Sequence, residues 1–241
     1  MKIYVINLAR SVERHRKMQA QFESLSLPFE FIKAVDGGEL CNEEISAVSS
    51  KWRARLCHGR ELSRGEIGCA LSHIEFCRRV VTEESPGFVF EDDVQLSPDV
   101  KCALDEGEEF LAHTKDPCLV QLPGLERDIP CIGKECPEDD FIKVFSAMGA
   151  YAYGINPAGA ALLVKTFSPI KFPIDYYRHL IKHYGLNFYV YNRQVISVDM
   201  VLESTVGVER FKTHNGIGWL CYTLWRLVGK LIDGLLRAAG K

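Results

Sequence analysis

The stretch Gly87-Phe88-Val89-Phe90-Glu91-Asp92-Asp93 decides the fold, because a short apolar run leads directly into three adjacent acids. A continuous apolar run without alternation is typical of a strand that is buried on both faces, as in the parallel sheet of an α/β protein. We therefore expect a central strand over residues 87–90, with the acids at its carboxyl end.

Alternating strands and helices precede this strand. Ile3–Leu8 is a second apolar run, and residues 12–25 have helical apolar spacing with Ser11 as the cap. Phe29–Val35 predicts another strand, while residues 39–62 predict short helices or a loop. The order strand, helix, strand favours parallel pairing.

The same alternation continues beyond the acids. We expect strands over residues 119–122, 141–145, 151–155 and 188–191, and helices over residues 99–112, from Pro157, and from Pro173 through Tyr184. The predicted fold class is therefore α/β, with a mostly parallel, Rossmann-like sheet.

Polar residues follow three of the predicted strands. Asn7-Leu8, Asp36-Gly37 and the triplet at 91–93 all fall at carboxyl ends. Ligands of open α/β sheets bind beyond the carboxyl ends of the strands, so we expect these residues to form one site.

The triplet itself allows two interpretations. In an extended chain Glu91 and Asp93 point to one face and Asp92 to the other, so that one face holds a hard cation such as Mn²⁺ or Mg²⁺. The alternative is a solvated turn in which Asp93 caps the next element.

A helix is predicted from Ser63, because Ser63 and Glu66 match a capping box. Gly65 and Gly68 at its start allow close approach of backbone or of a ligand phosphate. His73 lies on the predicted polar side with Ser72, where it either contacts substrate or makes a structural hydrogen bond.

Composition excludes several classes of protein. The 241 residues are 47% hydrophobic and 25% charged, as in globular chains, and the net charge of −3 argues against a nucleic-acid partner. The nine cysteines include no C-x-x-C pair, which favours free thiols and a reducing compartment. The apolar run at the N-terminus is too short for the hydrophobic region of a signal peptide.

Five motifs occur in a fixed order along the chain: Ile6-Asn7-Leu8, Glu13-Arg14, Ala34-Val35-Asp36-Gly37, Leu62 to Cys69 with Ser72-His73, and Phe90 to Asp93. In this order they resemble glycosyltransferase family 25, the lipooligosaccharide and lipopolysaccharide galactosyltransferases, to which animal collagen galactosyltransferases are similar. A weaker resemblance continues through Gly149-Ala150-Tyr151 and Pro173-Ile174-Asp175 to about Ser204.

The resemblance implies a single GT-A-like nucleotide-sugar-binding domain over residues 1–209, a UDP-hexose donor, usually UDP-galactose, a divalent metal and inversion. Asp93 would be the metal ligand, and Glu91 and Asp92 would contact the donor. The nucleotide site would be lined by Asn7, Leu8, Arg14, Asp36 and Gly37.

Inversion needs a base for the acceptor hydroxyl. Asp175, His73 and Glu203 are candidates, and we favour Asp175, with helix capping as its alternative role. Residues 123–140 are rich in Pro, Gly and acids, which predicts an acceptor-side loop, a lid or a plain surface loop.

Residues 210–241 have a net charge of +5, which leaves −8 for residues 1–209. Apolar positions recur with helical spacing between Ile217 and Leu236, opposite Arg226, Lys230 and Arg237. This predicts a C-terminal amphipathic helix on a membrane surface, and the alternative is docking on the core or in a homodimer interface.

The sequence therefore predicts an enzyme that transfers a hexose to a lipid-linked oligosaccharide of the lipopolysaccharide core. We expect it to be cytoplasmic and peripheral on the inner face of the bacterial inner membrane. Two alternatives remain. One is a catalytically inactive nucleotide-sugar-binding or membrane-tethered protein. The other is a metal-dependent phosphoesterase, for which a His-rich second ligand cluster is missing.

Overall fold

A computed structural model describes residues 1–125 and 140–198, which form an α/β domain. Its helices are α1 (Val12–Ser24), α2 (Asn42–Val48), α3 (Lys51–His58), α4 (Arg64–Glu83), α5 (Val100–His113), α6 (Pro157–Thr166) and α7 (Tyr177–Tyr184). Its strands are β1 (Lys2–Asn7), β2 (Glu30–Lys33), β3 (Gly87–Glu91), β4 (Val94–Leu96), β5 (Cys118–Gln121), β6 (Phe141–Lys143), β7 (Ala152–Ile155), β8 (Asn187–Tyr191) and β9 (Ile196–Val198).

The main sheet has the strand order β2-β1-β3-β7-β5-β8-β6. β1 pairs in parallel with both neighbours, so that Val5 lies beside Phe31 on one side and Phe90 on the other. Within the described residues, β6 and β7 run antiparallel to their neighbours, while the other five strands share one direction. The predicted mostly parallel sheet is confirmed, with β6 and β7 as its exceptions.

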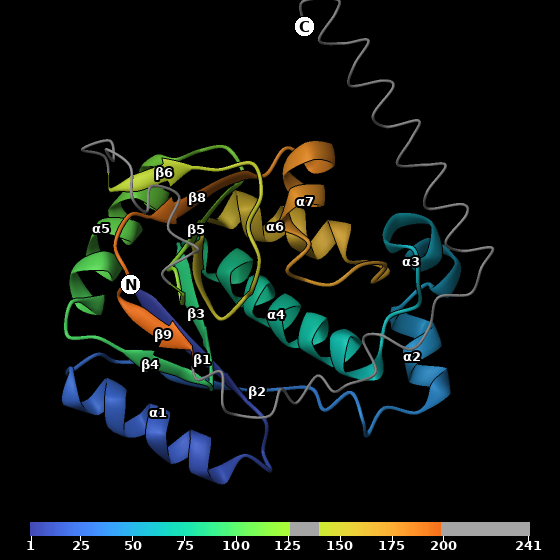
Figure 1. Cartoon of the computed structure of the whole chain (residues 1–241), viewed down its shortest axis with the longest axis horizontal. Coiled ribbons are helices and arrows are strands. Elements are labelled where there is room, and N and C mark those ends of the chain that lie inside the picture. Colours follow the sequence, from blue (N-terminus) through green and yellow to red (C-terminus); the bar gives the residue numbers. More distant parts are fainter. Residues whose placement is uncertain (126–139, 199–241) are drawn as a thin grey trace, which may run out of the picture.

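Helices cover both faces of the sheet (Figure 1). Successive side chains of a strand point to opposite faces, and β1 follows this rule. Ile3 and Val5 pack in one apolar cluster with residues of α1 and α5, while Tyr4 and Ile6 pack in another with residues of α4, α6 and α7. This two-sided burial explains why β1 and β3 have continuous apolar runs rather than alternating ones.

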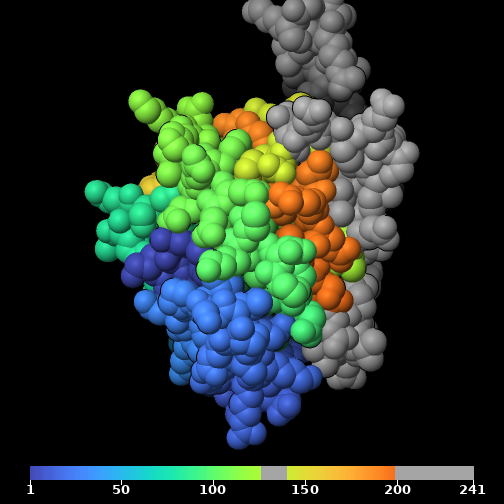
Figure 2. Space-filling model, turned by 90° about the vertical axis from the view of Figure 1, so that its left-hand side faces the viewer, coloured from blue at the N-terminus to red at the C-terminus, as the bar shows by residue number. Residues whose placement is uncertain are grey.

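The face with α1 and α5 is turned to the viewer in Figure 2, where the blue atoms of the N-terminal segment adjoin the green atoms of residues near 100. Beside them β4 and β9 form a separate two-stranded antiparallel sheet, with Gln95 opposite Ser197. This small sheet is not predicted by the sequence, because three-residue strands carry too few residues for a period to show.

One helix starts later than predicted, and one predicted capping bond is absent. α7 begins at Tyr177, after a turn that contains Ile174 and Asp175, rather than at Pro173. Ser11 precedes α1 as predicted, but its side chain makes no capping hydrogen bond. The polar segment over residues 39–62 contains the short helices α2 and α3.

Several expectations lie outside the described residues, namely the amphipathic helix in residues 210–241, Glu203, and most of the loop over residues 123–140. Within residues 1–125 and 140–198, no helix is long and apolar enough to cross a membrane. None of the six cysteines in those ranges forms a disulfide.

Candidate functional site

A cavity of about 380 Å³ lies at the carboxyl ends of β1, β2 and β3, beside the first turns of α4. Eight of the predicted site residues line it: Leu8, Arg14, Asp36, Gly37, His73, Glu91, Asp92 and Asp93. The carboxyl ends of these three strands therefore meet at one cavity, as the parallel arrangement predicts.

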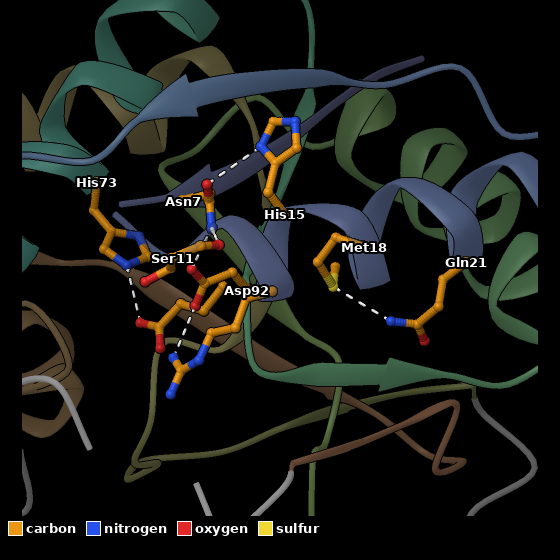
Figure 3. A network of polar contacts seen from close by, with 9 residues as sticks. Asn7, Ser11, His15, Met18, Gln21, His73 and Asp92 are labelled. Atoms are coloured by element: carbon orange, nitrogen blue, oxygen red, sulfur yellow. Dashed lines mark hydrogen bonds and ion pairs between the residues drawn. The ribbon is translucent and has the colours of Figure 1, made fainter. Parts of the chain in front are cut away.

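Asp92 is held by two residues from the N-terminal segment (Figure 3). Asn7 Nδ2 donates to Asp92 Oδ2 at 2.6 Å, and Arg14 donates to Asp92 Oδ1 at 3.0 Å. Asn7 also contacts His15 through its Oδ1, at 3.3 Å from His15 Nδ1. Asn7 was expected to line the nucleotide site, but it is buried and fixes the acidic turn instead.

Glu91 faces the opposite side, toward α4. His73 Nε2 lies 3.2 Å from Glu91 Oε1, and His73 Nδ1 lies 3.1 Å from the hydroxyl of Tyr153 on β7. His73 is fully buried, so the prediction that it and Ser72 lie on the polar side of α4 is wrong. Both ring nitrogens have a protein partner, which favours a structural role over direct proton transfer.

Asp93 carries an unfavourable charge in this structure. Its Oδ1 is buried and has no hydrogen-bond partner in the described part of the chain. Burial, and then the charges of Glu91 and Asp92, raise the pKa of Asp93 to about 7. Asp92 and Asp93 form a turn rather than extended chain, and all three acids line the same cavity.

The acidic turn fits a hard divalent cation. A buried carboxylate oxygen without a donor, next to two further carboxylates, is the kind of donor set that Mg²⁺ and Mn²⁺ prefer. The fit comes from Asp93 above all, since Asp92 is already bound by Asn7 and Arg14.

Two arginines that sequence reasoning missed also line the cavity. Arg10 forms an ion pair with Asp36, and Arg64, the first residue of α4, donates to Asn42 Oδ1 at 2.8 Å. Together with Arg14 they bring three arginines to the lining of the cavity that the acids also line. A position three residues after the end of β1 or at the start of a helix is the signal that would have marked them.

The start of α4 is pressed against the chain that follows β2. The capping box is confirmed, with Ser63 N donating to Glu66 at 2.9 Å and Glu66 N to Ser63 Oγ at 3.2 Å. A Cβ on Gly68 would lie 2.6 Å from the carbonyl oxygen of Val35. Gly68 therefore serves backbone packing and not a ligand, and Ser72 Oγ accepts from Val35 N at 2.9 Å in the same contact.

Asp175 does not line this cavity. It lies in the turn before α7, near Tyr177, a fully buried residue whose hydroxyl has no hydrogen-bond partner in the described ranges. Burial and then the charges of Asp175 and Glu91 raise the pKa of Tyr177 well above its usual value. The charges of Asp175 and Glu91, which belong to different parts of the chain, thus both act on Tyr177.

The chain was compared with known proteins. The model of glycosyltransferase family 25, described as an LPS biosynthesis protein, matches residues 1–178. A glycosyltransferase 25 family member of Aedes aegypti is 38% identical over 100 residues, which are 40% of this chain and 16% of the relative. Procollagen galactosyltransferase 1 of Danio rerio is 27% identical over 210 residues, 78% of this chain and 33% of the relative.

A third relative, from Bos taurus, is named "probable inactive glycosyltransferase 25 family member 3" and is 26% identical over 216 residues, 83% of this chain and 36% of its own length. This chain thus spans between a sixth and about a third of the curated relatives it matches. The family match covers more than half of the chain and all three strands that form the cavity, and the chain belongs to glycosyltransferase family 25.

Proposed function

We propose that this protein transfers a hexose from a UDP-hexose to a hydroxyl group of an acceptor glycan, with galactose as the sugar. The observation that carries the proposal is the acidic turn at residues 91–93, which lines the cavity with a buried, unsatisfied oxygen of Asp93. Membership in a glycosyltransferase family supports the reaction class, and the names of the procollagen galactosyltransferases support galactose.

The donor nucleotide would lie along the carboxyl ends of β1 and β2. Leu8, Asp36 and Gly37 line that part of the cavity, and Arg10 and Arg64 supply positive charge beside them. Guanidinium groups bind phosphate oxygens through paired hydrogen bonds, so these two side chains suit a diphosphate.

The acidic turn at residues 91–93 would bind the cation, and the residues that contact these acids would keep them in position. Mn²⁺ or Mg²⁺, when bound at Asp93 beside Glu91, would neutralise charge on the departing diphosphate. Arg14 and Asn7 keep Asp92 in place, and His73 orients Glu91, so the turn retains its shape as ligands enter.

For the acceptor proton we retain Asp175 as the proposed base, in an inverting displacement. Its support is its position near Tyr177, on which the charge of Glu91 also acts. Asp175→Asn is expected to bind UDP normally and to lose most of the turnover. Wild-type turnover in this variant would remove Asp175 from the mechanism, and NMR of the product anomeric centre would test inversion.

Two classes of acceptor glycan are consistent with the comparisons. A lipid-linked oligosaccharide of the lipopolysaccharide core agrees with the description of the family, whereas the three relatives named above are animal proteins, one of them a procollagen galactosyltransferase. Position on the inner face of a bacterial membrane depends on residues 210–241 and remains a prediction. Acceptor panels should contain both lipooligosaccharide and collagen-type hydroxyl groups.

A donor screen tests the function directly. Purified full-length chain is mixed with UDP-galactose, UDP-glucose or UDP-N-acetylhexosamines, with and without Mn²⁺, and released UDP is measured. We expect release from UDP-galactose that requires Mn²⁺ and increases with acceptor. Asp93→Ala should abolish it, while the exposed Asp99→Ala, whose side chain makes no capping bond, should not.

Two outcomes would favour the alternatives. Tight UDP binding without release for any donor and acceptor would indicate a nucleotide-sugar-binding protein without turnover, which the name of the bovine relative makes worth testing. Release that is independent of both Mn²⁺ and Asp93 would contradict the proposed role of the acidic turn.

A further inference from the structure

A second set of possible metal ligands lies on the α4 side of the cavity. Cys69, His73 and Glu91 each offer one ligand atom, and these atoms all lie within 4.8 Å of one another. We propose that this cluster binds a borderline-soft divalent cation, of which zinc is the representative, through Cys69 Sγ, His73 Nε2 and a Glu91 carboxylate oxygen. The proposal does not depend on the transferase activity.

The helix places two of the ligands together. Cys69 and His73 are four residues apart on α4, so their side chains lie on the same face, one turn apart. Glu91 comes from the end of β3, against which that face of α4 packs, and His73 Nε2 lies 3.2 Å from its Oε1. One helix and one strand thus supply three ligands without any loop rearrangement.

The distances suit a tetrahedral ion. Bonds of about 2.0–2.3 Å to one zinc ion put neighbouring ligand atoms roughly 3.3–3.8 Å apart. The His73–Glu91 separation is already at the lower end of this range, and a shift of roughly 1 Å closes the largest separation in the cluster. Three protein ligands leave a fourth position open toward the cavity, which all three residues line.

The surroundings of the cluster match those of metal-bound histidines. A histidine that binds metal through Nε2 carries its proton on Nδ1 and donates it to a second group. Here the Tyr153 hydroxyl lies 3.1 Å from His73 Nδ1, and both side chains are almost completely buried.

The chemistry of this cluster differs from that of Asp93. Thiolate and imidazole ligands select zinc or cobalt, whereas carboxylates alone select Mg²⁺ and Mn²⁺. A Cys69 thiolate and the Glu91 carboxylate carry two negative charges, which a divalent ion would balance. The same cavity therefore has one part suited to a hard cation and another suited to a softer one.

Cobalt titration tests the proposal, because Co²⁺ replaces zinc and reports its ligands by absorption. Full-length chain is stripped with a chelator and titrated with Co²⁺. We expect one equivalent to produce a thiolate-to-cobalt charge-transfer band and the visible bands of a four-coordinate ion, both of which zinc abolishes. Cys69→Ser should lose the charge-transfer band and weaken Co²⁺ binding by at least about 100-fold. Loss of a ligand's hydrogen-bond partner costs about 10- to 100-fold in metal affinity, and loss of the ligand itself should cost more.

Control variants locate the ion. Cys57→Ser removes another half-buried thiol and should keep the spectrum, and Asp93→Asn should keep it as well. Glu91→Gln should weaken Co²⁺ binding while retaining the thiolate band, and Tyr153→Phe should weaken it by about 10- to 100-fold. Circular dichroism confirms that each variant folds. No thiolate band in the wild-type protein, or an unchanged band in Cys69→Ser, would overturn the proposal.

Discussion

Asp92 lines the cavity, and its negative charge is balanced by neighbouring groups of the protein. Arg14 and Asp92 are mostly buried, with 16% and 11% of their side chains exposed, and they form an ion pair at 3.0 Å. Removing one member of such a pair leaves the other charge poorly solvated. We therefore regard the pair as the clamp that fixes the acidic turn to α1.

A double-mutant cycle measures this clamp. Arg14→Met is expected to lower the free energy of unfolding by about 1–3 kcal/mol, because Asp92 keeps only Asn7 as a donor. Asp92→Asn should lower the free energy of unfolding less in the Arg14→Met background than in the wild-type protein, and the difference should be at least about 1 kcal/mol. Urea denaturation of the four proteins gives the cycle, and strict additivity would show that the ion pair contributes nothing.

Asp93 predicts an unusual dependence of stability on pH. Its pKa is raised from 3.8 to about 7, so between these values the folded protein binds a proton that the unfolded chain releases, and stability falls as pH rises through this range. Asp93→Asn removes that penalty. In chelator at about pH 8, the variant should be more stable than wild type, on the order of 2 kcal/mol, with the gain vanishing near pH 4.

The comparison needs a control that carries the same change elsewhere. Asp99 is exposed at the start of α5, so Asp99→Asn should not reproduce the pH-dependent gain. A gain for Asp93→Asn that is equal at both pH values would show that the buried charge is not its source. Thermal melting across the pH range provides the measurement.

The individual contacts of the site were the least predictable feature from sequence. The acids at residues 91–93 were identifiable, because their position after an apolar strand is local information. The partner of each acid was not, since Asn7 and His73 lie 85 and 18 residues from theirs. A side chain's contacts depend on which surfaces meet, and a single sequence does not state that.

At the scale of elements, α4 is the helix that organises the site. Its capping box is a local feature, which is why its start at Ser63 was predictable. Its burial on the sheet-facing side reaches Ser72 and His73, which polar character alone assigns to the surface. Tertiary packing explains why these two polar residues are buried. The Ser72 hydroxyl accepts a hydrogen bond from the backbone N–H of Val35, and the His73 ring contacts the Glu91 carboxylate.

Gly68→Ala is the sharpest test of how α4 packs. The added Cβ would lie 2.6 Å from Val35 O and from Gly37 N, which are backbone atoms that cannot rotate away. Such overpacking is expected to cost about 1–3 kcal/mol of stability and to weaken UDP binding, because Gly37 lines the cavity. Gly38→Ala is the matched control, since its Cβ would meet only the Asp36 side chain at 3.3 Å. A stabilising Gly68→Ala would contradict the close contact.

α7 carries a second pH-sensitive feature. Burial, and then the positive charges of His183, Lys171 and His58, lower the pKa of His179 to about 4. The unfolded chain therefore binds the proton first, near pH 6.5, and stability falls as pH drops from there toward 4. His179→Phe, which preserves packing against Phe172, should reduce the loss between about pH 7.5 and about pH 5 by on the order of 1 kcal/mol.

The exposed His113→Gln serves as the control for this prediction, because that side chain lies at the end of α5. Chemical denaturation of wild type and the two variants at the two pH values gives the three losses of stability that are compared. If His179→Phe and wild type lose the same stability on acidification, His179 is not the titrating group.

For the molecule as a whole, the sequence predicts the arrangement of helices and sheet in layers better than it predicts the directions of β6 and β7. Continuous apolar runs in β1 and β3 require helices on both faces, and the structure has them. The antiparallel directions of β6 and β7 were not predictable, because strand direction depends on connections between distant segments. The site lies where β1, β2 and β3 end, and the carboxyl ends of parallel strands meet at one edge of a sheet, so its location could be predicted while its contacts could not.

The proposed cation and nucleotide share one cavity, so their binding should be coupled through the stability of the whole domain. A ligand that binds only the folded state raises stability by about 2.7 kcal/mol at 100 times its Kd, or about 5–10 °C in Tm for a chain of this size. We expect UDP and Mn²⁺ together to raise Tm by more than the sum of their separate effects, because the nucleotide's phosphates and Asp93 would share the ion. The coupling should decrease below about pH 7, where a proton competes for Asp93. In Asp93→Ala the two shifts should become additive, whereas in Asp99→Ala the coupling should remain. Additive shifts in the wild-type protein at about pH 8 would separate the cation from the nucleotide site and contradict the metal role of the acidic turn.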